Sequence, residues 1–241
     1  MNLIIDIGNT QAKLVMFDGE TPVAEHRTSN ETLEALPLVL EQFAIRRAIV
    51  GSVADPSPAL DLMLSSLPFP TLRMTPSTPL PLIENLYRTP HTLGLDRLAA
   101  VVGAVSQKPG HDLLVIDAGT CVTYDFVDHK GRYLGGNISP GLHMRLQAMH
   151  EQTARLPLVD EAGETPLLGH DTETALRSGA QHGLRYEMEG YIQALKQKYP
   201  SLLVFLTGGG LSDFDSPIKS GIFADRFLVS RGLNRILQHN T

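Results

Sequence analysis

Cysteine, tryptophan and basic charge are scarce in this chain. Its 241 residues include one cysteine, Cys121, and no tryptophan, and aromatic residues make up 6%. A single cysteine excludes an intramolecular disulfide. The formal net charge is −6 and no basic stripe is present, which argues against a nucleic-acid partner. No apolar run approaches the length that spans a bilayer, so we expect no membrane partner.

Several familiar site motifs are also missing from the sequence. The nine histidines form no His-Glu-x-x-His pattern, and there is neither a Gly-x-x-x-x-Gly-Lys-Ser/Thr loop nor a Gly-x-Gly-x-x-Gly fingerprint. The first apolar run is interrupted by Asp6 and has no basic residues before it, so it does not resemble a signal peptide. With 42% hydrophobic residues the chain can bury a sizeable core. These features predict a soluble, cytoplasmic protein.

The feature that is present is a polar turn between two apolar runs, Asp6-Ile7-Gly8-Asn9-Thr10 followed by Lys13. The pattern predicts strand, turn, strand. Glycine in the turn lets backbone N–H groups approach an anion. The Thr10 hydroxyl can donate to a phosphate oxygen, and the Lys13 ammonium supplies a positive charge. The Asp6 carboxylate can hold Mg²⁺, most simply through water.

A related turn, Asp117-Ala118-Gly119-Thr120, lies 111 positions after Asp6 and is again flanked by apolar runs. One Asp-x-Gly turn is usually only a hairpin turn. Two of them, spaced by almost half the chain, indicate a duplicated fold with a cleft between the halves.

The order of the predicted elements supports this interpretation. In the first half, three strands, a helix, a strand, a second helix and a short strand match a ribonuclease-H-like unit, a mixed α/β sheet with flanking helices. The break at Gln107-Lys108-Pro109-Gly110 divides the chain into halves 1–109 and 110–241. The predicted fold class is therefore α/β, with duplicated ribonuclease-H-like halves of the actin-like ATPase type.

Some local predictions are specific enough to be tested. Asn30 is expected to cap a helix over 32–43, Pro56-Ser57-Pro58 to begin a second, and Asp171 or Thr172 to begin a long helix reaching about Tyr199. A further helix is expected over 95–106, where apolar residues recur on one face. Segment 83–92 is expected to be irregular and 135–141 a flexible loop.

Taken together, the motifs resemble those of the type III pantothenate kinases. The resemblance covers nearly the whole chain in the family's order, and Gly94-Leu95-Asp96-Arg97 is its most specific part. The remaining motifs are the turn at Asp6 with Lys13, the turn at Asp117, Gly135-Gly136 with Ile138-Ser139-Pro140-Gly141, Thr172-x-x-Ala175-x-x-Ser178-Gly179, and Thr207-Gly208-Gly209.

This resemblance implies ATP-dependent phosphorylation of pantothenate to 4′-phosphopantothenate, the first step towards coenzyme A. It implies Asp96 as general base, Mg²⁺ at Asp6, and a monovalent cation, K⁺ or NH₄⁺, at Asp117. It also implies a homodimer whose pantothenate pocket is completed by the partner subunit. The implied ATP-binding residues are Asp6, Ile7, Gly8, Asn9, Thr10, Gln11, Ala12, Lys13 and Thr120. The implied pantothenate-binding residues are Tyr87, Gly94, Leu95, Asp96, Arg97 and Thr172.

Two other functions remain open from the sequence. One is a different small-molecule kinase of the same superfamily, against which the Gly-x-Asp-Arg motif argues. The other is a nucleotide-binding transcriptional accessory protein, since a fold alone does not fix a function. The presence of Asp6, Lys13, Asp96 and Asp117 favours an enzyme, because a purely regulatory protein does not need a base beside a phosphate-binding turn.

Overall fold

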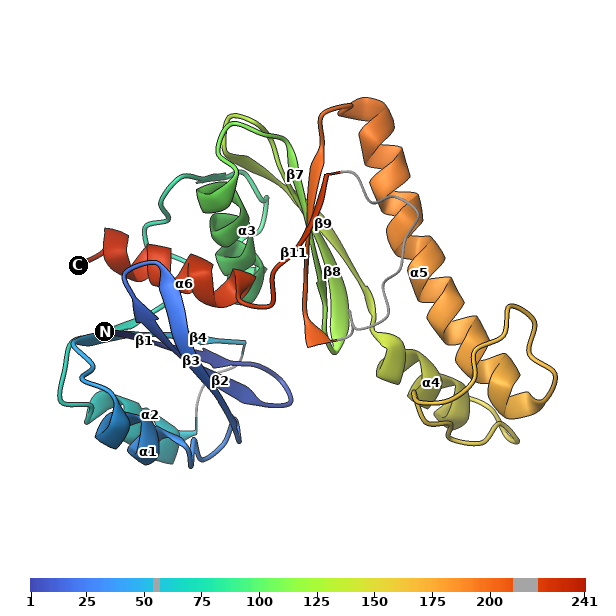
Figure 1. Ribbon diagram of the computed structural model, residues 1–241, viewed down its shortest axis with the longest axis horizontal. Coiled ribbons are helices and arrows are strands. Elements are labelled where there is room, and N and C mark those ends of the chain that lie inside the picture. The colour runs from blue at the N-terminus through green and yellow to red at the C-terminus, as the bar shows by residue number, and fades with distance from the viewer. Residues whose placement is uncertain (54–56, 210–220) are drawn as a thin grey trace. The chain divides into compact units, whose positions relative to one another are not determined.

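The computed structural model describes residues 1–53, 57–209 and 221–241. Within these residues the chain forms two mixed sheets with flanking helices (Figure 1). The predicted α/β class is confirmed. No helix in the described part of the chain is both long and apolar enough to cross a membrane.

The first sheet has the strand order β3-β2-β1-β4-β5. β2 runs antiparallel to both β1 and β3, whereas β4 is parallel to β1 and β5 is parallel to β4. The strands are β1 (Asn2–Ile7), β2 (Ala12–Asp18), β3 (Thr21–Thr28), β4 (Arg47–Ser52) and β5 (Thr71–Arg73). This order and these directions are those of the predicted ribonuclease-H-like unit.

The second sheet has the strand order β11-β10-β7-β8-β9-β6. Its strands are β6 (Glu84–Asn85), β7 (Leu113–Ala118), β8 (Cys121–Val127), β9 (Arg132–Pro140), β10 (Leu203–Thr207) and β11 (Ile222–Ala224). When β7 is counted as its first strand, the third, second, first, fourth and fifth strands are again neighbours in that order. The sheet topology is therefore duplicated, with β6 added at one edge.

Six α-helices and one 3₁₀ turn accompany the sheets in the described residues. They are α1 (Leu36–Gln42), α2 (Pro58–Ser65), the 3₁₀ turn η1 (Pro90–Thr92), α3 (Leu95–Gln107), α4 (Leu142–Glu151), α5 (Thr172–Lys198) and α6 (Leu228–His239). α1 and α2 cover one face of the first sheet, where Leu36, Val39, Leu60 and Leu64 pack on strand residues such as Leu14.

The contacts of the chain divide it into two compact units. Unit 1 contains 1–111, 126–135 and 227–241, and unit 2 contains 112–125 and 136–226. The first boundary, at His111, lies close to the predicted one between 109 and 110. The predicted halves differ from these units at two places, because the tip of the β8–β9 hairpin and the C-terminal helix α6 belong with unit 1. The predicted cleft between the halves stays a prediction.

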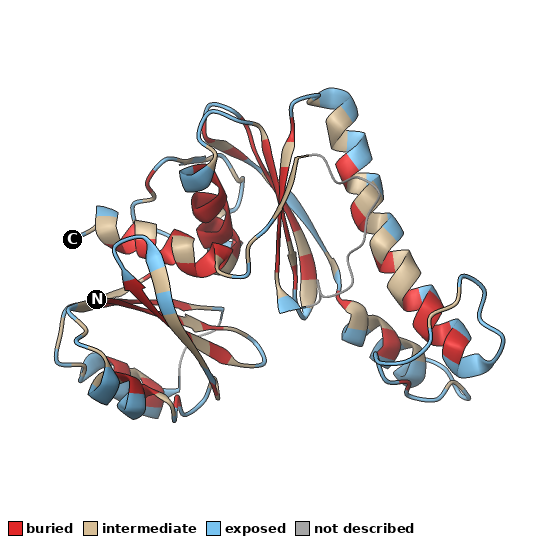
Figure 2. Cartoon of the chain, in the orientation of Figure 1, coloured by how far each residue is buried: buried red, intermediate tan, exposed pale blue. Residues whose placement is uncertain are grey.

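α6 joins unit 1 through close packing against α3. A Cβ atom at Gly103 would collide with the Leu228 carbonyl oxygen, and one at Gly232 with the Ala99 carbonyl oxygen, so the two backbones touch. Figure 2 shows α3 buried along most of its length. The Asn2 side chain on β1 donates a buried hydrogen bond of 2.7 Å to Asn234 of α6. The last helix therefore supports the first strand.

Three local predictions need correction, and one strand was missed. The first helix begins at Leu36 and not near residue 32, because Leu33 has a φ of 47° that a helix cannot continue. Segment 83–92 contains β6, whose residues Glu84 and Asn85 pair with Arg132 and Tyr133. The predicted loop 135–141 is mostly strand, since β9 continues to Pro140. Finally, β11 was not predicted at all.

Other predictions agree with the structure. α5 runs over 27 residues and is capped by Asp171, whose carboxylate accepts from the Thr174 backbone N–H at 2.8 Å. α2 begins at Pro58 and is capped by Ser57. The proposed helix start at Pro56 lies outside the described residues.

Candidate functional site

Unit 1 contains a carboxylate and an ammonium on neighbouring strands. Asp6 is the last residue but one of β1, and Lys13 is directly opposite it on β2. On the other side Asp6 is level with Gly51 of β4, which has no side chain. Burial raises the pKa of Asp6 to about 6, against the opposing effect of Lys13, and Asp96 adds a further increase. Lys13 and Asp96 are therefore each close enough to Asp6 to affect its charge.

The turn between β1 and β2 is compact at its base and exposed at its tip. The Gly8 N–H donates to the Gln11 carbonyl at 3.0 Å, and Asn9 and Thr10 are exposed. The side chains of Ile7 and Ala12 are buried in the core under the sheet. These two predicted ATP-binding residues can therefore offer only backbone groups to a ligand.

Asn30 is a functional candidate that the sequence analysis assigned to another role. Its side-chain amide does not cap a helix. It donates to the Gly8 carbonyl at 3.1 Å and to the Asn9 carbonyl at 2.8 Å. Asn30 therefore clamps the first turn from the loop after β3. An asparagine two residues after a predicted strand was the only available signal, and it is equally typical of a helix cap.

The Gly94-Leu95-Asp96-Arg97 segment forms the beginning of α3, as predicted. Asp96 lies in the first turn of α3, where the helix dipole favours a carboxylate. Its Oδ1 accepts from the Arg97 backbone N–H at 2.9 Å. A Cβ atom at Gly94 would collide with that same oxygen, so glycine at this position allows the carboxylate to fold back over the helix end.

Arg97 and Tyr87 meet in unit 1 although Tyr87 lies before the helix. The Arg97 guanidinium carbon is 6.0 Å from the centre of the Tyr87 ring, and only 6% of Arg97 is exposed. The Tyr87 ring is 6.1 Å from that of Tyr133 and leans over Gly135. The structure thus brings together the predicted substrate-binding residues of unit 1, while Leu95 contributes only the first position of the helix.

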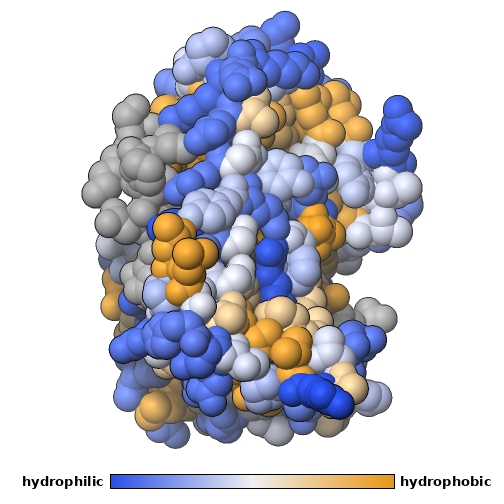
Figure 3. Space-filling view, turned by 90° about the vertical axis from the view of Figure 1, so that its right-hand side faces the viewer, coloured by the Kyte–Doolittle hydropathy of each residue, from blue (hydrophilic) through white to orange (hydrophobic). Residues whose placement is uncertain are grey.

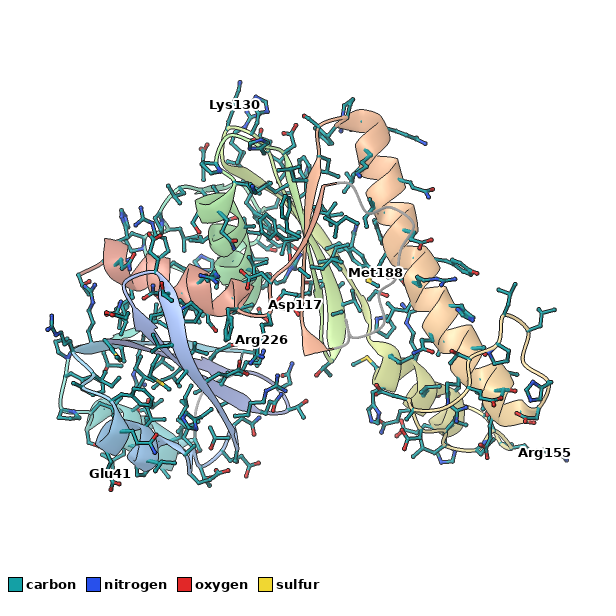
Figure 4. The ribbon with its side chains drawn as sticks, viewed as in Figure 1. Glu41, Asp117, Lys130, Arg155, Met188 and Arg226 are labelled. Carbon is teal, nitrogen blue, oxygen red and sulfur yellow. The ribbon has the colours of Figure 1, made fainter. Side chains whose placement is uncertain are left out.

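The second turn lies in unit 2 and has its own close contacts. Asp117 is the last residue but one of β7 and is level with Thr207 of β10 (Figure 4). Thr120 is exposed in the two-residue turn that follows. The Gly141 N–H, at the start of α4, donates to the Thr120 carbonyl at 3.1 Å. Gly141 was quoted in a motif, but its contact with the turn could not be predicted.

Gly208 borders the oxygen atoms at the end of β7. Its φ is +101°, and a Cβ atom there would lie 2.6 Å from Asp117 Oδ1 and would collide with the Ala118 carbonyl oxygen. A carboxylate and a carbonyl oxygen thus converge on a place that only glycine leaves open. Oxygen donors suit hard cations, so the residues present fit the cation implied at Asp117.

No group of three or more histidine, cysteine, aspartate or glutamate residues in 1–53, 57–209 and 221–241 could hold a metal ion. Mg²⁺ in phosphoryl-transfer sites is commonly held by one or two carboxylates, waters and the substrate phosphates. The single carboxylate of Asp6, near the end of β1 and just before the exposed Asn9 and Thr10, fits that mode of binding.

Thr172 is the one predicted site residue of unit 2 that stands apart from the second turn. It is the exposed first residue of α5, and it is Asp171 that caps the helix. In Figure 1 the beginning of α5 lies beside the far end of α4, away from the β7–β8 turn.

The duplicated topology and the two acidic turns place the chain in the class of actin-like and sugar-kinase-type ATPase folds. A structure of a putative 2-dehydro-3-deoxygalactonokinase from Sinorhizobium meliloti matches with a TM-score of 0.60 at 15% identity, covering 99% of both chains. A structure described as a putative Baf family transcriptional activator from Campylobacter jejuni matches with a TM-score of 0.63 at 21% identity, covering 99% of this chain and 98% of that one. At these identities the matches establish the fold alone.

Sequence comparison narrows the class to one family. The type III pantothenate kinase model matches residues 2–194. The type III pantothenate kinase of Bacteroides fragilis is 57% identical over 240 residues, covering 100% of this chain and 98% of the relative. That of Phocaeicola vulgatus is 54% identical, with 100% and 99% covered. The chain belongs to the type III pantothenate kinase family, and the resemblance drawn from its motifs is confirmed.

Proposed function

We propose that the protein transfers the γ-phosphoryl group of ATP to the primary hydroxyl of pantothenate, giving 4′-phosphopantothenate and ADP, the first step of coenzyme A biosynthesis. The observation that carries this proposal is that Lys13 and Asp96 both act on the charge of Asp6 in unit 1, while Arg97, next to Asp96, lies against Tyr87. Full-length relatives at 54–57% identity that are named as this kinase support it.

The phosphate-binding role belongs to the first turn. Phosphoryl transfer depends mainly on positioning and on neutralising charge. The Lys13 ammonium binds the phosphate oxygens, the exposed backbone of Asn9 and Thr10 and the Thr10 hydroxyl orient them, and Gly8 lets the turn form closely enough to do so. Mg²⁺, when bound with ATP near Asp6, spreads the negative charge of the phosphates. In the second turn Thr120 faces the phosphates, and Asp117 holds the monovalent cation.

The acceptor role belongs to the start of α3. The Asp96 carboxylate orients the pantothenate hydroxyl and takes its proton as the oxygen bonds to the γ-phosphorus and the bond to the bridging oxygen of ADP breaks. A weak base suffices, because in a loose transition state the proton leaves late. Arg97 binds the pantothenate carboxylate with two parallel hydrogen bonds, and the Tyr87 ring keeps its guanidinium in place.

We infer a homodimer in which Thr172 serves the pantothenate site of the partner subunit. The separation of Thr172 from the second turn supports this, because an exposed helix start can serve a neighbouring subunit. As an enzyme of coenzyme A biosynthesis using cellular ATP, the protein is proposed to act in the cytoplasm.

A coupled assay of ADP release tests the function directly. We expect turnover with pantothenate and none with glucose, acetate or glycerol; turnover that is independent of pantothenate, or a preference for a sugar, would contradict the proposal. Asp96→Asn should lose nearly all turnover and still bind ATP. Asp61→Asn is the matched control, since Asp61 lies in the first turn of α2 and pairs with Arg73.

A further inference from the structure

A four-residue polar network in unit 2 lies outside the residues that the proposed reaction uses. It centres on Glu187, which projects from the middle of α5. The Glu187 carboxylate accepts from the Tyr124 hydroxyl at 2.7 Å and from the Ser139 hydroxyl at 3.0 Å. It also pairs with the guanidinium of Arg145 on α4. One carboxylate thus links a strand residue of β8, the end of β9 and the first turns of α4.

The network is enclosed by its surroundings. Tyr124 is 2% exposed, and its ring lies 4.2 Å from that of Tyr191, one helical turn beyond Glu187. The side chains of Arg145 and Glu187 are only 20% and 25% exposed. The neighbouring Met188 is buried and lies between α5 and the strands (Figure 4). Charged hydrogen bonds in such an environment are less screened than those at a free surface.

Burial and hydrogen bonding have opposite effects on the pKa of Glu187, and the combined effect of its hydrogen-bond partners is the larger one. Burial alone would raise the pKa of the carboxyl, but the hydrogen bonds from Arg145, Tyr124 and Ser139 together hold it below its ordinary value. The same carboxylate and burial raise the pKa of the Tyr124 phenol, which stays protonated as a donor. The network therefore holds one fixed arrangement of donors and acceptors at neutral pH.

The network is connected to the turn that carries Thr120 through the segment 139–141. Arg145 donates to the Ser139 hydroxyl and to the Pro140 carbonyl, both at 2.8 Å. The next residue, Gly141, donates its backbone N–H to the Thr120 carbonyl at 3.1 Å. A Cβ atom at Gly141 would lie 2.6 Å from that carbonyl oxygen, so the two segments are pressed together.

We propose that Glu187 is a positioning residue for ATP binding, acting through Arg145 and Ser139 to hold segment 139–141 against the turn that carries Thr120. The inference rests on the proposed role of Thr120 at the ATP phosphates. Glu187 itself does not touch the turn.

Figure 3 shows the face on the α4 and α5 side as mostly hydrophilic with a few apolar groups.

The test is Glu187→Gln in the full chain, with ATP affinity measured by calorimetry and exchange of the Gly141 amide measured by NMR. Glutamine keeps the size and an acceptor for Tyr124 but loses the charge opposite Arg145. Loss of a charged hydrogen bond predicts an ATP dissociation constant raised about tenfold. The Gly141 amide should exchange about tenfold faster, since its protection reports local opening. The KM for pantothenate should stay within about twofold, because Asp96 and Arg97 are in unit 1 and Thr172 is at the far end of α5 from Glu187, about four helical turns away.

Asp128→Asn is the matched control. The buried Asp128 carboxylate also pairs with an arginine, accepting from the partly exposed Arg132 guanidinium at 2.6 and 2.8 Å, but it lies in the β8–β9 turn of unit 1. Asp128→Asn should lower the melting temperature about as much as Glu187→Gln does, but it should leave ATP affinity and Gly141 exchange unchanged.

An unchanged ATP affinity in Glu187→Gln, or an equal change in Asp128→Asn, would overturn the inference. If Glu187→Gln fails to fold, Arg145→Lys replaces it: it keeps the charge, loses the fork that reaches Ser139 and Pro140, and should weaken ATP binding in the same direction. A wild-type protein that binds no ATP would instead refute the proposed function, so the two failures are distinguishable.

Discussion

The two acidic turns occupy the same place in a repeated topology but are held in different ways. The first has four residues between β1 and β2 and is clamped by a side chain, the amide of Asn30. The second has two residues between β7 and β8 and is clamped by the backbone N–H of Gly141. Each clamp follows the third strand of its sheet. The same topological position thus supplies the support, although the chemistry of the support has diverged.

The two acidic turns also differ in the charge of the strand that follows each of them. The first turn is followed by Lys13 on β2, whereas β8 contains no basic residue. The first turn can therefore neutralise a phosphate by itself. The second offers an aspartate, carbonyl oxygens and a hydroxyl, which suit a cation and the orientation of a ligand. Duplication supplied two similar scaffolds, and each acquired a separate electrostatic task.

The largest expected effect comes from removing the charge of the first turn. Lys13→Met should lower kcat/KM for ATP by about 10²–10³, the typical loss when a preorganised group that stabilises the transition state is removed. Steady-state kinetics with varied ATP measures it. Arg27→Met is the control, because Arg27 is level with Lys13 on β3 but pairs with Glu25 at 3.1 Å. Comparable losses in both variants would show that the charge of Lys13 has no special role.

Gly208, beside the end of β7, should be more sensitive to added volume than Gly8 in the first turn. Gly208→Ala should cost about 1–3 kcal/mol of stability, because its Cβ would meet the backbone at the end of β7 and its φ is +101°. Thermal unfolding measures the loss. Gly209→Ala is the control, since a Cβ there meets nothing within 4 Å. Gly8→Ala, whose Cβ would lie 3.1 Å from the Gln11 carbonyl, should cost less. Equal melting temperatures for Gly208→Ala and Gly209→Ala would refute this packing argument.

The clamp of the first turn should have a moderate effect. Asn30→Ala removes two hydrogen bonds to the Gly8 and Asn9 carbonyls. Each bond contributes about 0.5–1.5 kcal/mol, so the KM for ATP should rise about tenfold with little change in the KM for pantothenate. Asn30→Asp is a sharper variant, because a carboxylate cannot donate to a carbonyl and repels it. If Asn30→Asp binds ATP like the wild type, the clamp is not needed.

Asn30 also shows where prediction from the sequence reached its limit. Most of the strands and the α3 and α5 helices were predicted because apolar spacing and capping residues are local signals. An asparagine amide that caps a helix and one that clamps a turn look the same locally, and only the fold decides which backbone groups it meets. The strand at 135–140 was missed because its glycines and Pro140 are typical of a loop, whereas in the sheet β9 lies beside β8 and continues to Pro140. The Glu187 network draws on residues from 124 to 187, so no local pattern contains it.

The smallest expected effect is a difference in pH dependence between Asp6, before the first turn, and Glu187, in the network behind the second. The pKa of Asp6 is raised by burial to about 6 from 3.8, so its protonated form is favoured in the folded, metal-free protein. Its stabilising contribution is present below pH 4 and is lost as pH rises to about 6. The pKa of Glu187 is lowered from 4.5, so its contribution is present above that value and is lost as pH falls.

Melting temperatures between pH 3.5 and 7, without metal or nucleotide, measure this contrast. Relative to the wild type, Asp6→Asn should gain stability as pH rises from about 4 to about 6, by on the order of 1 kcal/mol after allowance for solvent screening. Glu187→Gln should be less stable than the wild type at neutral pH. This difference should shrink as pH falls below about 4.5, because protonation then removes the same charge from the wild type. If both variants followed the wild-type curve in parallel, neither carboxylate would carry the shift, and the electrostatic distinction between the two turns would rest on Lys13 alone.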